Sequence, residues 1–272
     1  MGNLRKNYEK MRSLVLVSAT VSLVLTGAGC QQKTATPNQM PDESSDATAA
    51  NARLAEAETL WDGREDLSKA RAAVATLRQA QTADYSNYEV AWKLSRAAFY
   101  VGEHTGSDSE QDDMFRTGIE AGKAAIQLQP NKPEGHFWLG ANYGSRAAHS
   151  TLANLSSFTD IKNEMDAVMK IDESYEAYSA YLGLGRLYLQ APRAFGGDSK
   201  TAIEYLEKGV KLSPNNTMMR LDLAEAYAQN SRNPDAKKQI DAIMSATPDP
   251  KHDPERKEAM AKAQKLLAKI NS

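Results

Sequence analysis

The sequence predicts an all-α fold, an α-solenoid in which antiparallel helix hairpins are stacked one on the next. Two observations lead to this prediction: residues 184–215 read as one complete hairpin, and the pattern of that hairpin recurs further along the chain. The second helix of the hairpin carries four apolar residues on one face: Ala202, Ile203, Leu206 and Val210. Because a single hairpin cannot bury this face, the fold requires neighbouring hairpins.

The turn of this hairpin has the residues that a sharp reversal needs. Pro192 stops the first helix, because it lacks a backbone donor and clashes with the preceding turn. Gly196 and Gly197 allow the positive φ of a tight turn, and Asp198 can cap the second helix through its carboxylate. We therefore expect a helix, a tight turn and a second helix here.

The recurrence has a fixed period. Three positions of the hairpin are matched 34 residues later: Ala202 by Ala236, Leu206 by Ile240 and Pro214 by Pro248. This is the spacing of tetratricopeptide repeats, whose first helix also carries a Leu-Gly pair followed by a tyrosine. That series occurs twice, at Leu184, Gly185 and Tyr188, and at Leu139, Gly140 and Tyr143. Residues 51–248 are therefore predicted to be degenerate tetratricopeptide repeats.

The remaining elements follow from apolar spacing and turn signals. A first hairpin is predicted on either side of a break at Asp62 and Gly63, with Leu54, Ala57, Trp61, Leu67, Ala70, Val74, Leu77 and Ala80 as its apolar residues. A helix with Trp92 follows, then a polar loop over 102–113 and a helix over 115–128. The next hairpins are predicted as an overlong helix from Pro133 with a helix at 160–170, the hairpin described above, and a hairpin over 217–245. Residues 249–272 are expected to form a charged helix that caps the array.

The first thirty residues resemble a processing segment. Residues 1–29 have a basic start, an uncharged apolar stretch and small residues at the end, as in a lipoprotein-type signal peptide. Cys30 follows, and its position resembles the lipid-modified cysteine of bacterial lipoproteins, although Gly27 stands where that motif usually has leucine. A plain secretory peptide and an uncleaved anchor are the alternatives, and Met11 is an alternative start to Met1.

A flexible tether is predicted to follow the signal segment. After Cys30, residues 31–50 lack large aliphatic and aromatic side chains and are rich in Thr, Ser, Pro and Asp. Gln31, in place of aspartate, favours the outer membrane by resemblance to sorting rules in diderm bacteria. With the lipidated cysteine, the tether over 30–50 predicts a lipid-anchored protein of the bacterial cell envelope, on the periplasmic face of the outer membrane.

Composition and motifs give no sign of catalysis, a metal or a cofactor. The chain has 272 residues, a net charge of −2 and 41% hydrophobic residues, so it has no basic footprint for nucleic acid. The Gly-x-Gly at 183–185 lies inside a helix, where small residues let two helices approach closely. The acidic run at 108–113 departs from the calcium-loop pattern, and the four histidines form no metal-binding pair. Three tyrosines at three-residue spacing, Tyr175, Tyr178 and Tyr181, are expected to pack between helices.

The surface expected to bind something is the wall formed by the first helix of each hairpin. By analogy with the usual repeat geometry we place seven residues there: Phe137, Ala141, Leu182, Arg186, Leu189, Leu221 and Glu225. This set is mostly apolar with one cation and one anion. It suits a hydrophobic small molecule or an amphipathic helix better than a highly charged peptide. The alternative is that several of these residues pack against neighbouring hairpins.

The cysteine signal, the degenerate repeats and the turn APRAFGGD before KTAIEYLEKGVKLSPNN together resemble the T component associated with TRAP transporters, over most of residues 55–244. The resemblance implies a helical periplasmic lipoprotein that forms trimers with a hydrophobic pore and associates with the solute-binding subunit of the transporter. The segments around Trp92 and His136 also resemble repeat proteins related to eukaryotic regulators of microtubule dynamics.

Two functions follow as hypotheses. The first is a non-enzymatic, membrane-tethered tetratricopeptide lipoprotein that binds a partner protein and a hydrophobic ligand, as a TRAP-associated T component would. The second is a general assembly scaffold of the cell envelope without a small-molecule site. An enzyme with an unrecognised site is a third and weaker hypothesis.

Overall fold

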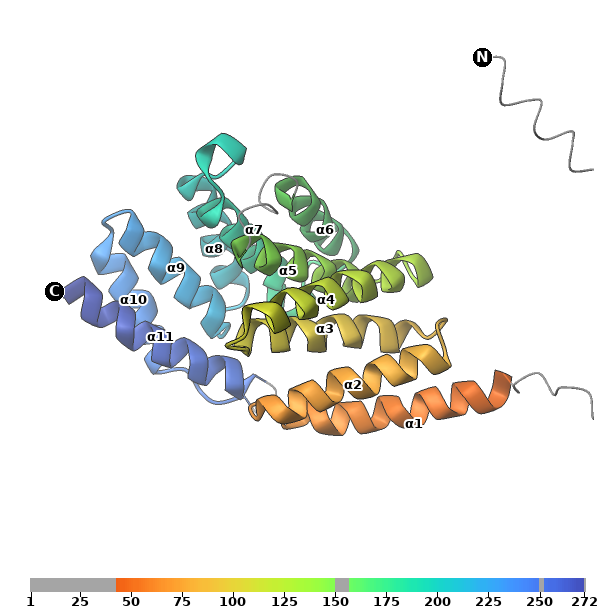
Figure 1. The fold of residues 1–272 in the computed structure, drawn as a ribbon. Helices are drawn as coiled ribbons and strands as arrows, with labels where there is room; N and C mark the ends of the chain where they lie inside the picture. The colour runs from red at the N-terminus through yellow and green to blue at the C-terminus, as the bar shows by residue number, and fades with distance from the viewer. Residues whose placement is uncertain (1–42, 150–156, 250–251, 272) are drawn as a thin grey trace, which may run out of the picture. The chain divides into compact units, whose positions relative to one another are not determined.

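The computed structural model describes residues 43–149, 157–249 and 252–271, and these residues are almost entirely helical (Figure 1). Within these ranges there is no strand, which confirms the predicted all-α class. The helices are α1 (Glu43–Asp62), α2 (Leu67–Ala83), α3 (Tyr88–His104), α4 (Asp108–Leu128), α5 (Pro133–His149), α6 (Ser157–Asp172), α7 (Tyr175–Gln190), the short 3₁₀ helix η3 (Arg193–Phe195), α8 (Ser199–Leu212), α9 (Thr217–Gln229), α10 (Asn233–Met244) and α11 (Asp253–Asn271).

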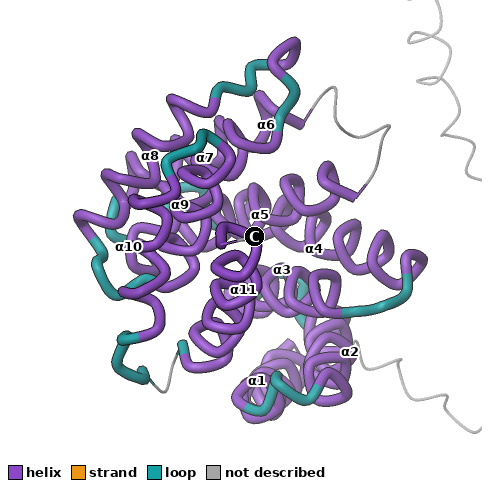
Figure 2. Tube along the Cα trace, turned by 90° about the vertical axis from the view of Figure 1, so that its left-hand side faces the viewer, coloured by secondary structure: helices purple, strands orange, loops and turns teal. Residues whose placement is uncertain are grey.

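The helices pack as successive hairpins. The pairs α1–α2, α3–α4, α5–α6, α7–α8 and α9–α10 are each in contact, and the first helix of a hairpin also contacts the first helix of the next (Figures 1 and 2). Each second helix in turn contacts the first helix of the following hairpin. This is the stacking of a tetratricopeptide solenoid, in which every hairpin buries the apolar face of its neighbour.

The 34-residue period of the sequence is a repeat of buried positions. Ala202 and Leu206 on α8 are fully buried, and so are Ala236 and Ile240 at the matching positions of α10. All but Ala202 belong to one core cluster, against which the partly buried Val210 also packs. The predicted apolar face of α8 is therefore confirmed, and it is covered by the hairpin that follows.

The turn between α7 and α8 differs from the prediction at one glycine. Helix α7 ends before Pro192, and Asp198 caps α8 by accepting hydrogen bonds from the backbone N–H groups of Lys200 and Thr201, both as expected. Gly196 has a positive φ of 102°, whereas Gly197 does not. Gly197 is needed for space instead, because a Cβ there would lie 1.8 Å from the carbonyl oxygen of Ala191.

The first helix begins earlier than the sequence indicated. Helix α1 starts at Glu43, so the predicted tether over 30–50 is wrong for its last eight residues. Three alanines among residues 47–50 favour helix, and Ala50 is fully buried. Cys30, the signal segment and the rest of the tether lie outside the described residues.

The predicted polar loop over 102–113 is also wrong. Helix α3 continues to His104 and α4 begins at Asp108, which leaves three residues between the two helices. The hydroxyl of Ser107 accepts a hydrogen bond from the backbone N–H of Glu110 and caps α4. Acidic residues in the first turn also favour a helix N-terminus, because they face its positive dipole end. The acidic run that read as a loop is thus the start of a helix.

Helix α11 does more than cap the last hairpin. It packs on α9 and α10 through its buried residues Ala259 and Ala263. Its other end lies beside the turn between α1 and α2 (Figure 1). There Glu255 accepts a hydrogen bond from Arg64 at 3.0 Å, and Lys257 lies 2.9 Å from Glu65. The last helix therefore joins the last hairpin to the first, a contact that the sequence did not predict.

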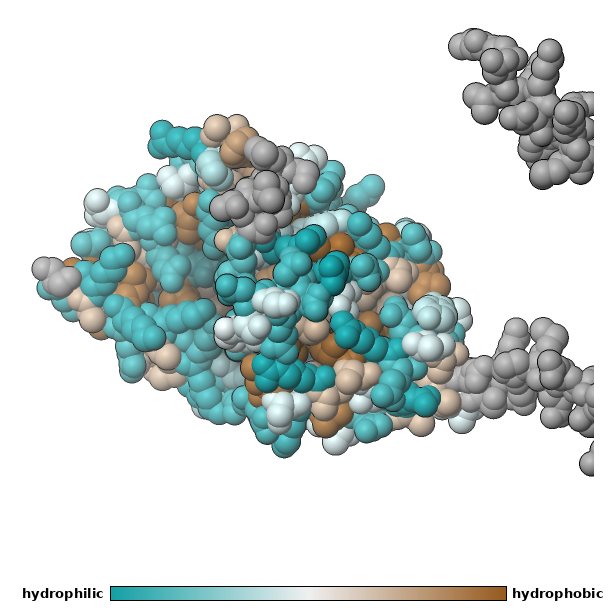
Figure 3. Space-filling view, viewed as in Figure 1, coloured by the Kyte–Doolittle hydropathy of each residue, from teal (hydrophilic) through white to brown (hydrophobic). Residues whose placement is uncertain are grey.

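The surface is mainly polar. On the face shown in Figure 3 hydrophilic residues predominate, and hydrophobic residues form small patches among them. No helix in the described ranges has a stretch long and apolar enough to span a membrane.

Candidate interaction surface

The first helices α3, α5, α7 and α9 each present one face that is neither fully buried nor freely exposed, and we call these faces the inner wall. Six of the seven predicted wall residues are half-buried: Phe137, Ala141, Leu182, Arg186, Leu189 and Glu225. Leu139 and Leu184, which lie on the opposite side of α5 and α7, are buried in the core. Phe137, Leu182 and Leu189 also pack against core clusters, so the wall as a binding surface stays a prediction.

Leu221 is the exception. Its side chain is only 2% exposed, and it belongs to the same core cluster as Ala259 and Ala263 of α11. The prediction that Leu221 lines an accessible wall is wrong, because α11 packs on α9. Sequence reasoning treated α11 as a solvent-facing cap and so left that face of α9 open.

The best-defined polar feature of the wall is an ion pair between Arg186 on α7 and Asp222 on α9. The guanidinium donates through Nε to Asp222 Oδ2 and through Nη2 to Oδ1, the latter at 3.2 Å. Asp222 is 8% exposed, whereas the side chain of Arg186 is 35% exposed. The two-point geometry fixes the orientation of the guanidinium.

The charges around this pair belong to several helices. Burial alone would lower the pKa of Arg186. The negative charges of Asp222, Glu103 and Glu225 outweigh the effect of burial, so the pKa of Arg186 is raised. Burial raises the pKa of Glu225, and Asp222 raises it further, while Arg186 and two lysines of α11 oppose the shift. Arg186 is therefore a permanent cation, surrounded by carboxylates from α3 and α9.

A second cationic position lies on α3. Arg96 donates to Glu58 of α1 at 2.7 Å, and its guanidinium carbon lies 4.2 Å from the ring centroid of Trp61 and 5.1 Å from that of Trp92. Stacking on two indoles holds the cation by cation–π attraction. Sequence reasoning missed Arg96, although the local series Leu-Ser-Arg at 94–96 parallels Leu-Gly-Arg at 184–186 and could have revealed it.

A cluster of aromatic rings lies on α3, α5 and α7. The ring of Phe137 lies 5.0 Å from that of Trp138 and 5.4 Å from that of Tyr175, both edge-on, and Phe99 lies 5.6 Å from Trp138. Edge-on pairs of this kind are favourable and rigid. Phe137 was predicted as a wall residue, whereas no sequence pattern indicated that Phe99 and Trp138 accompany it.

The predicted tyrosine stripe is divided. Residues Glu176, Ala177 and Tyr178 have positive φ values of 45°, 56° and 64°, so α7 is kinked after Tyr175. This conformation is costly for residues with a Cβ. Tyr175 consequently packs with Phe137 on α5, while Tyr181, at 2% exposure, lies in the core. Core packing is confirmed for Tyr181, but the three residues do not form one seam.

The Gly-x-Gly at 183–185 has a packing role. A Cβ on Gly183 would lie 2.7 Å from Met165 Sδ, and a Cβ on Gly185 would lie 2.4 Å from Leu206 Cγ. The glycines thus allow the side chains of α6 and α8 to reach the backbone of α7, as predicted. Within the described ranges no three His, Cys, Asp or Glu residues are placed to hold a metal ion.

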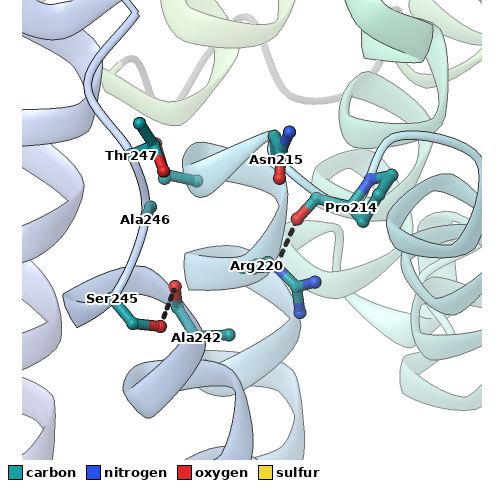
Figure 4. Close-up of a pocket in the computed structure, with 8 residues that line it drawn as sticks. Pro214, Asn215, Arg220, Ala242, Ser245, Ala246 and Thr247 are labelled. Atoms are coloured by element: carbon teal, nitrogen blue, oxygen red, sulfur yellow. Dashed lines mark hydrogen bonds between the residues drawn. The ribbon is translucent and has the colours of Figure 1, made fainter.

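Two cavities lie away from the wall. One, of about 230 Å³, is bounded by the start of α9 and the end of α10 (Figure 4). The other, of about 330 Å³, includes Lys200 of α8 and Arg232 at the start of α10. Neither contains any of the predicted wall residues.

Two family models match the chain. The model described as TRAP transporter T-component matches residues 122–271, and the model described as Regulator of microtubule dynamics protein 1-3 matches residues 53–190. No curated protein matches the sequence.

Solved structures resemble the fold at low sequence identity. A thermophilic TPR protein of Thermus thermophilus is 18% identical with a TM-score of 0.61, and the match covers 81% of this chain and all of that one. PilF of Pseudomonas aeruginosa is 15% identical with a TM-score of 0.51, over 83% of this chain and 93% of that one. These similarities show the fold of a tetratricopeptide solenoid.

Proposed function

The chain belongs to the TRAP transporter T-component family through residues 122–271, and to the family of regulators of microtubule dynamics through residues 53–190; we propose that it acts as a T component that binds a partner protein on its inner wall. The partner in this proposal is the solute-binding subunit of a TRAP transporter. The protein itself carries out no catalysis, and a hydrophobic ligand can occupy the apolar part of the wall.

The observation that carries the proposal is the Arg186–Asp222 pair. The oriented cation lies on α7 with the half-buried leucines Leu182 and Leu189, and Arg96 is a second cation on α3. Interfaces take most of their binding energy from such arginine and aromatic anchors. Because an amphipathic segment offers an apolar stripe and one charged group, it is the element that this surface fits best.

The proposal is tested by titrating the full-length chain with a purified solute-binding subunit of a TRAP transporter. We expect saturable binding. The absence of binding would favour the second hypothesis, a general envelope scaffold without a small-molecule site.

The ligand part of the proposal has its own test. The fluorescence of the apolar probe N-phenylnaphthylamine should increase on binding to the wild type and should fail to increase with Leu182→Asp. Leu212→Asp is the matched control, since Leu212 is an exposed leucine at the end of α8, away from the wall. Equal fluorescence from both variants would remove the wall as the ligand site.

Lipid attachment at Cys30 would hold this surface at a membrane, and we propose the periplasmic face of the outer membrane as the location. A single cysteine after a signal-type segment supports this proposal. Cys30→Ser should move the protein from the membrane pellet to the soluble fraction. If the variant still pellets with membranes, the anchor is not at this cysteine.

A further inference from the structure

The cavity between α9 and α10 contains an arginine that forms no ion pair with any described residue. Arg220, on the first turn of α9, lies between the loop at Pro214 and Asn215 and the segment from Ser245 to Thr247 (Figure 4). Its Nε donates to the carbonyl oxygen of Pro214 at 2.7 Å, and Nη1 donates to Gln239 Oε1 at 2.6 Å. Both acceptors are neutral, so neither of them offsets the positive charge of the guanidinium.

The third nitrogen of the guanidinium, Nη2, has no partner among the described residues. Arg220 Nη2 makes no hydrogen bond to any residue in the described ranges, and no carboxylate there forms an ion pair with Arg220. Partial burial lowers the pKa of Arg220, and no described carboxylate counteracts this effect. A partly buried guanidinium without a counter-charge is unusual, because such charges are normally paired.

Other donors face the same space. Thr217 and Asn215 line the cavity, and neither side chain is engaged in a hydrogen bond with another described residue. Thr217 is also the first residue of α9, so the positive end of the helix dipole lies at this cavity. The volume of about 230 Å³ holds an oxyanion together with several waters, since one water takes about 30 Å³ of liquid volume.

The other cavity provides an internal comparison. Arg232 also lines a cavity, of about 330 Å³, but it is paired with Asp235 at 2.9 Å and with Glu207 at 3.7 Å. The two arginines lie at opposite ends of the hairpin formed by α9 and α10. Of these two, Arg220 alone presents an uncompensated positive charge to its cavity.

We propose that the cavity at Arg220 is a binding site for a small phosphate-type oxyanion, held by the free side of the guanidinium and by the side chains of Thr217 and Asn215. A tetrahedral oxyanion has several acceptor oxygens, so one ion can accept from the guanidinium and from both side chains. The site is separate from the inner wall, so it adds a second binding function to the one proposed above.

Inorganic phosphate is the first probe, titrated into the full-length chain and followed by calorimetry. The wild type should bind it saturably, and Arg220→Gln should weaken binding by about tenfold to a hundredfold, the usual effect of losing a charge-assisted hydrogen bond. Arg232→Gln is the matched control and should change the affinity by less than about twofold. Thr217→Val, which keeps the arginine and its structural bonds, should weaken binding about fivefold.

Two further arms separate the sources of the oxyanion. Vesicles of phosphatidylcholine with phosphatidic acid are compared with phosphatidylcholine alone, using the wild type and Arg220→Gln, which share the same N-terminus. Retention by phosphatidic acid that depends on Arg220 identifies a lipid headgroup, whereas binding of free phosphate alone identifies a soluble ion; both support the proposal. It is overturned if neither probe binds the wild type, or if Arg220→Gln and Arg232→Gln behave alike. Binding of the solute-binding subunit should be unchanged in Arg220→Gln, so the two proposals fail independently.

Discussion

Replacing Gly197 with alanine should open the turn between α7 and α8. The added Cβ would lie 1.8 Å from the carbonyl oxygen of Ala191 and 2.6 Å from its carbonyl carbon. Both are backbone atoms, so no side-chain rotation can relieve the overlap. The chain must therefore move at this turn.

The magnitude follows from the hydrogen bonds that such a movement breaks. Gly197 N–H donates to the carbonyl oxygen of Pro192 at 3.1 Å, and Asp198 N–H donates to that of Tyr188 at 2.9 Å. Each bond contributes about 1 kcal/mol, and displacing Asp198 from its capping position costs about 1 kcal/mol more. Alanine lowers the entropy of the unfolded chain and returns about 0.4–1 kcal/mol. The free energy of unfolding should therefore fall by about 1–3 kcal/mol.

Urea unfolding followed by circular dichroism measures this difference. Gly106→Ala is the matched control, because a Cβ there meets no atom within 4 Å and the residue has no positive φ. That variant should be more stable than the wild type by about 0.4–1 kcal/mol. If Gly197→Ala were as stable as Gly106→Ala, the turn would not have the geometry described, and the steric role of Gly197 would be refuted.

The remaining predictions concern the buried core and the ion pair between His104 of α3 and Glu258 of α11. Leu184→Ala should lower the free energy of unfolding by about 2–5 kcal/mol in the same urea assay, since Leu184 is fully buried; a loss below about 1 kcal/mol would place it outside the core. His104 Nε2 lies 3.6 Å from Glu258 Oε2. Burial lowers the pKa of His104, but Glu258, the backbone carbonyl of Tyr100 and the charge of Glu103 together outweigh burial and raise it. His104 and Lys262 in turn lower the pKa of Glu258 to about 2. The contact should therefore stabilise the fold fully between pH 4.5 and 6.5, weaken as the pH rises through the raised pKa of His104, and weaken again as the pH falls toward 2. His104→Gln should lose less stability than the wild type as the pH rises above 6.5, and parallel pH profiles would contradict this assignment.

The repeats were predictable because their signal is local. Ala202, Leu206, Ala236 and Ile240 are apolar at one spacing, and burial at each of these positions is what a stacked hairpin requires. The cap at Asp198 was equally readable, since it depends on residues two and three positions away. Local patterns of this kind determine both the helix and the face it buries.

The acidic start of α4 was predicted wrongly from its local composition. Residues 108–113 have the composition of a loop, but the cap at Ser107 and the helix dipole favour a helix there. The bidentate pairing of Glu110 with Arg71 of α2, at 2.7 Å for each oxygen, adds a tertiary contact that the sequence alone could not show.

The inner wall was predictable only in part. The helical register predicted half-burial for Phe137, Leu182 and Arg186, which the structure shows, but their role in binding stays a prediction. The partner of Arg186 lies 36 positions away, and the pair that joins α11 to the first hairpin spans 191 positions. Contacts of this range depend on how the stacked hairpins close on one another, so the burial of Leu221 under α11 could not be derived from spacing.

The central claim is that the charged pair of the inner wall binds the partner protein. Its most direct test is the affinity of the solute-binding subunit for a double variant, Arg186→Met with Asp222→Leu, which removes both charges without leaving one buried and unpaired. The exposed pair Arg232 and Asp235, replaced in the same way, is the matched control. We predict that the inner-wall variant binds at least about tenfold more weakly while the control binds like the wild type. Equal affinity of the two variants for the subunit would contradict the claim.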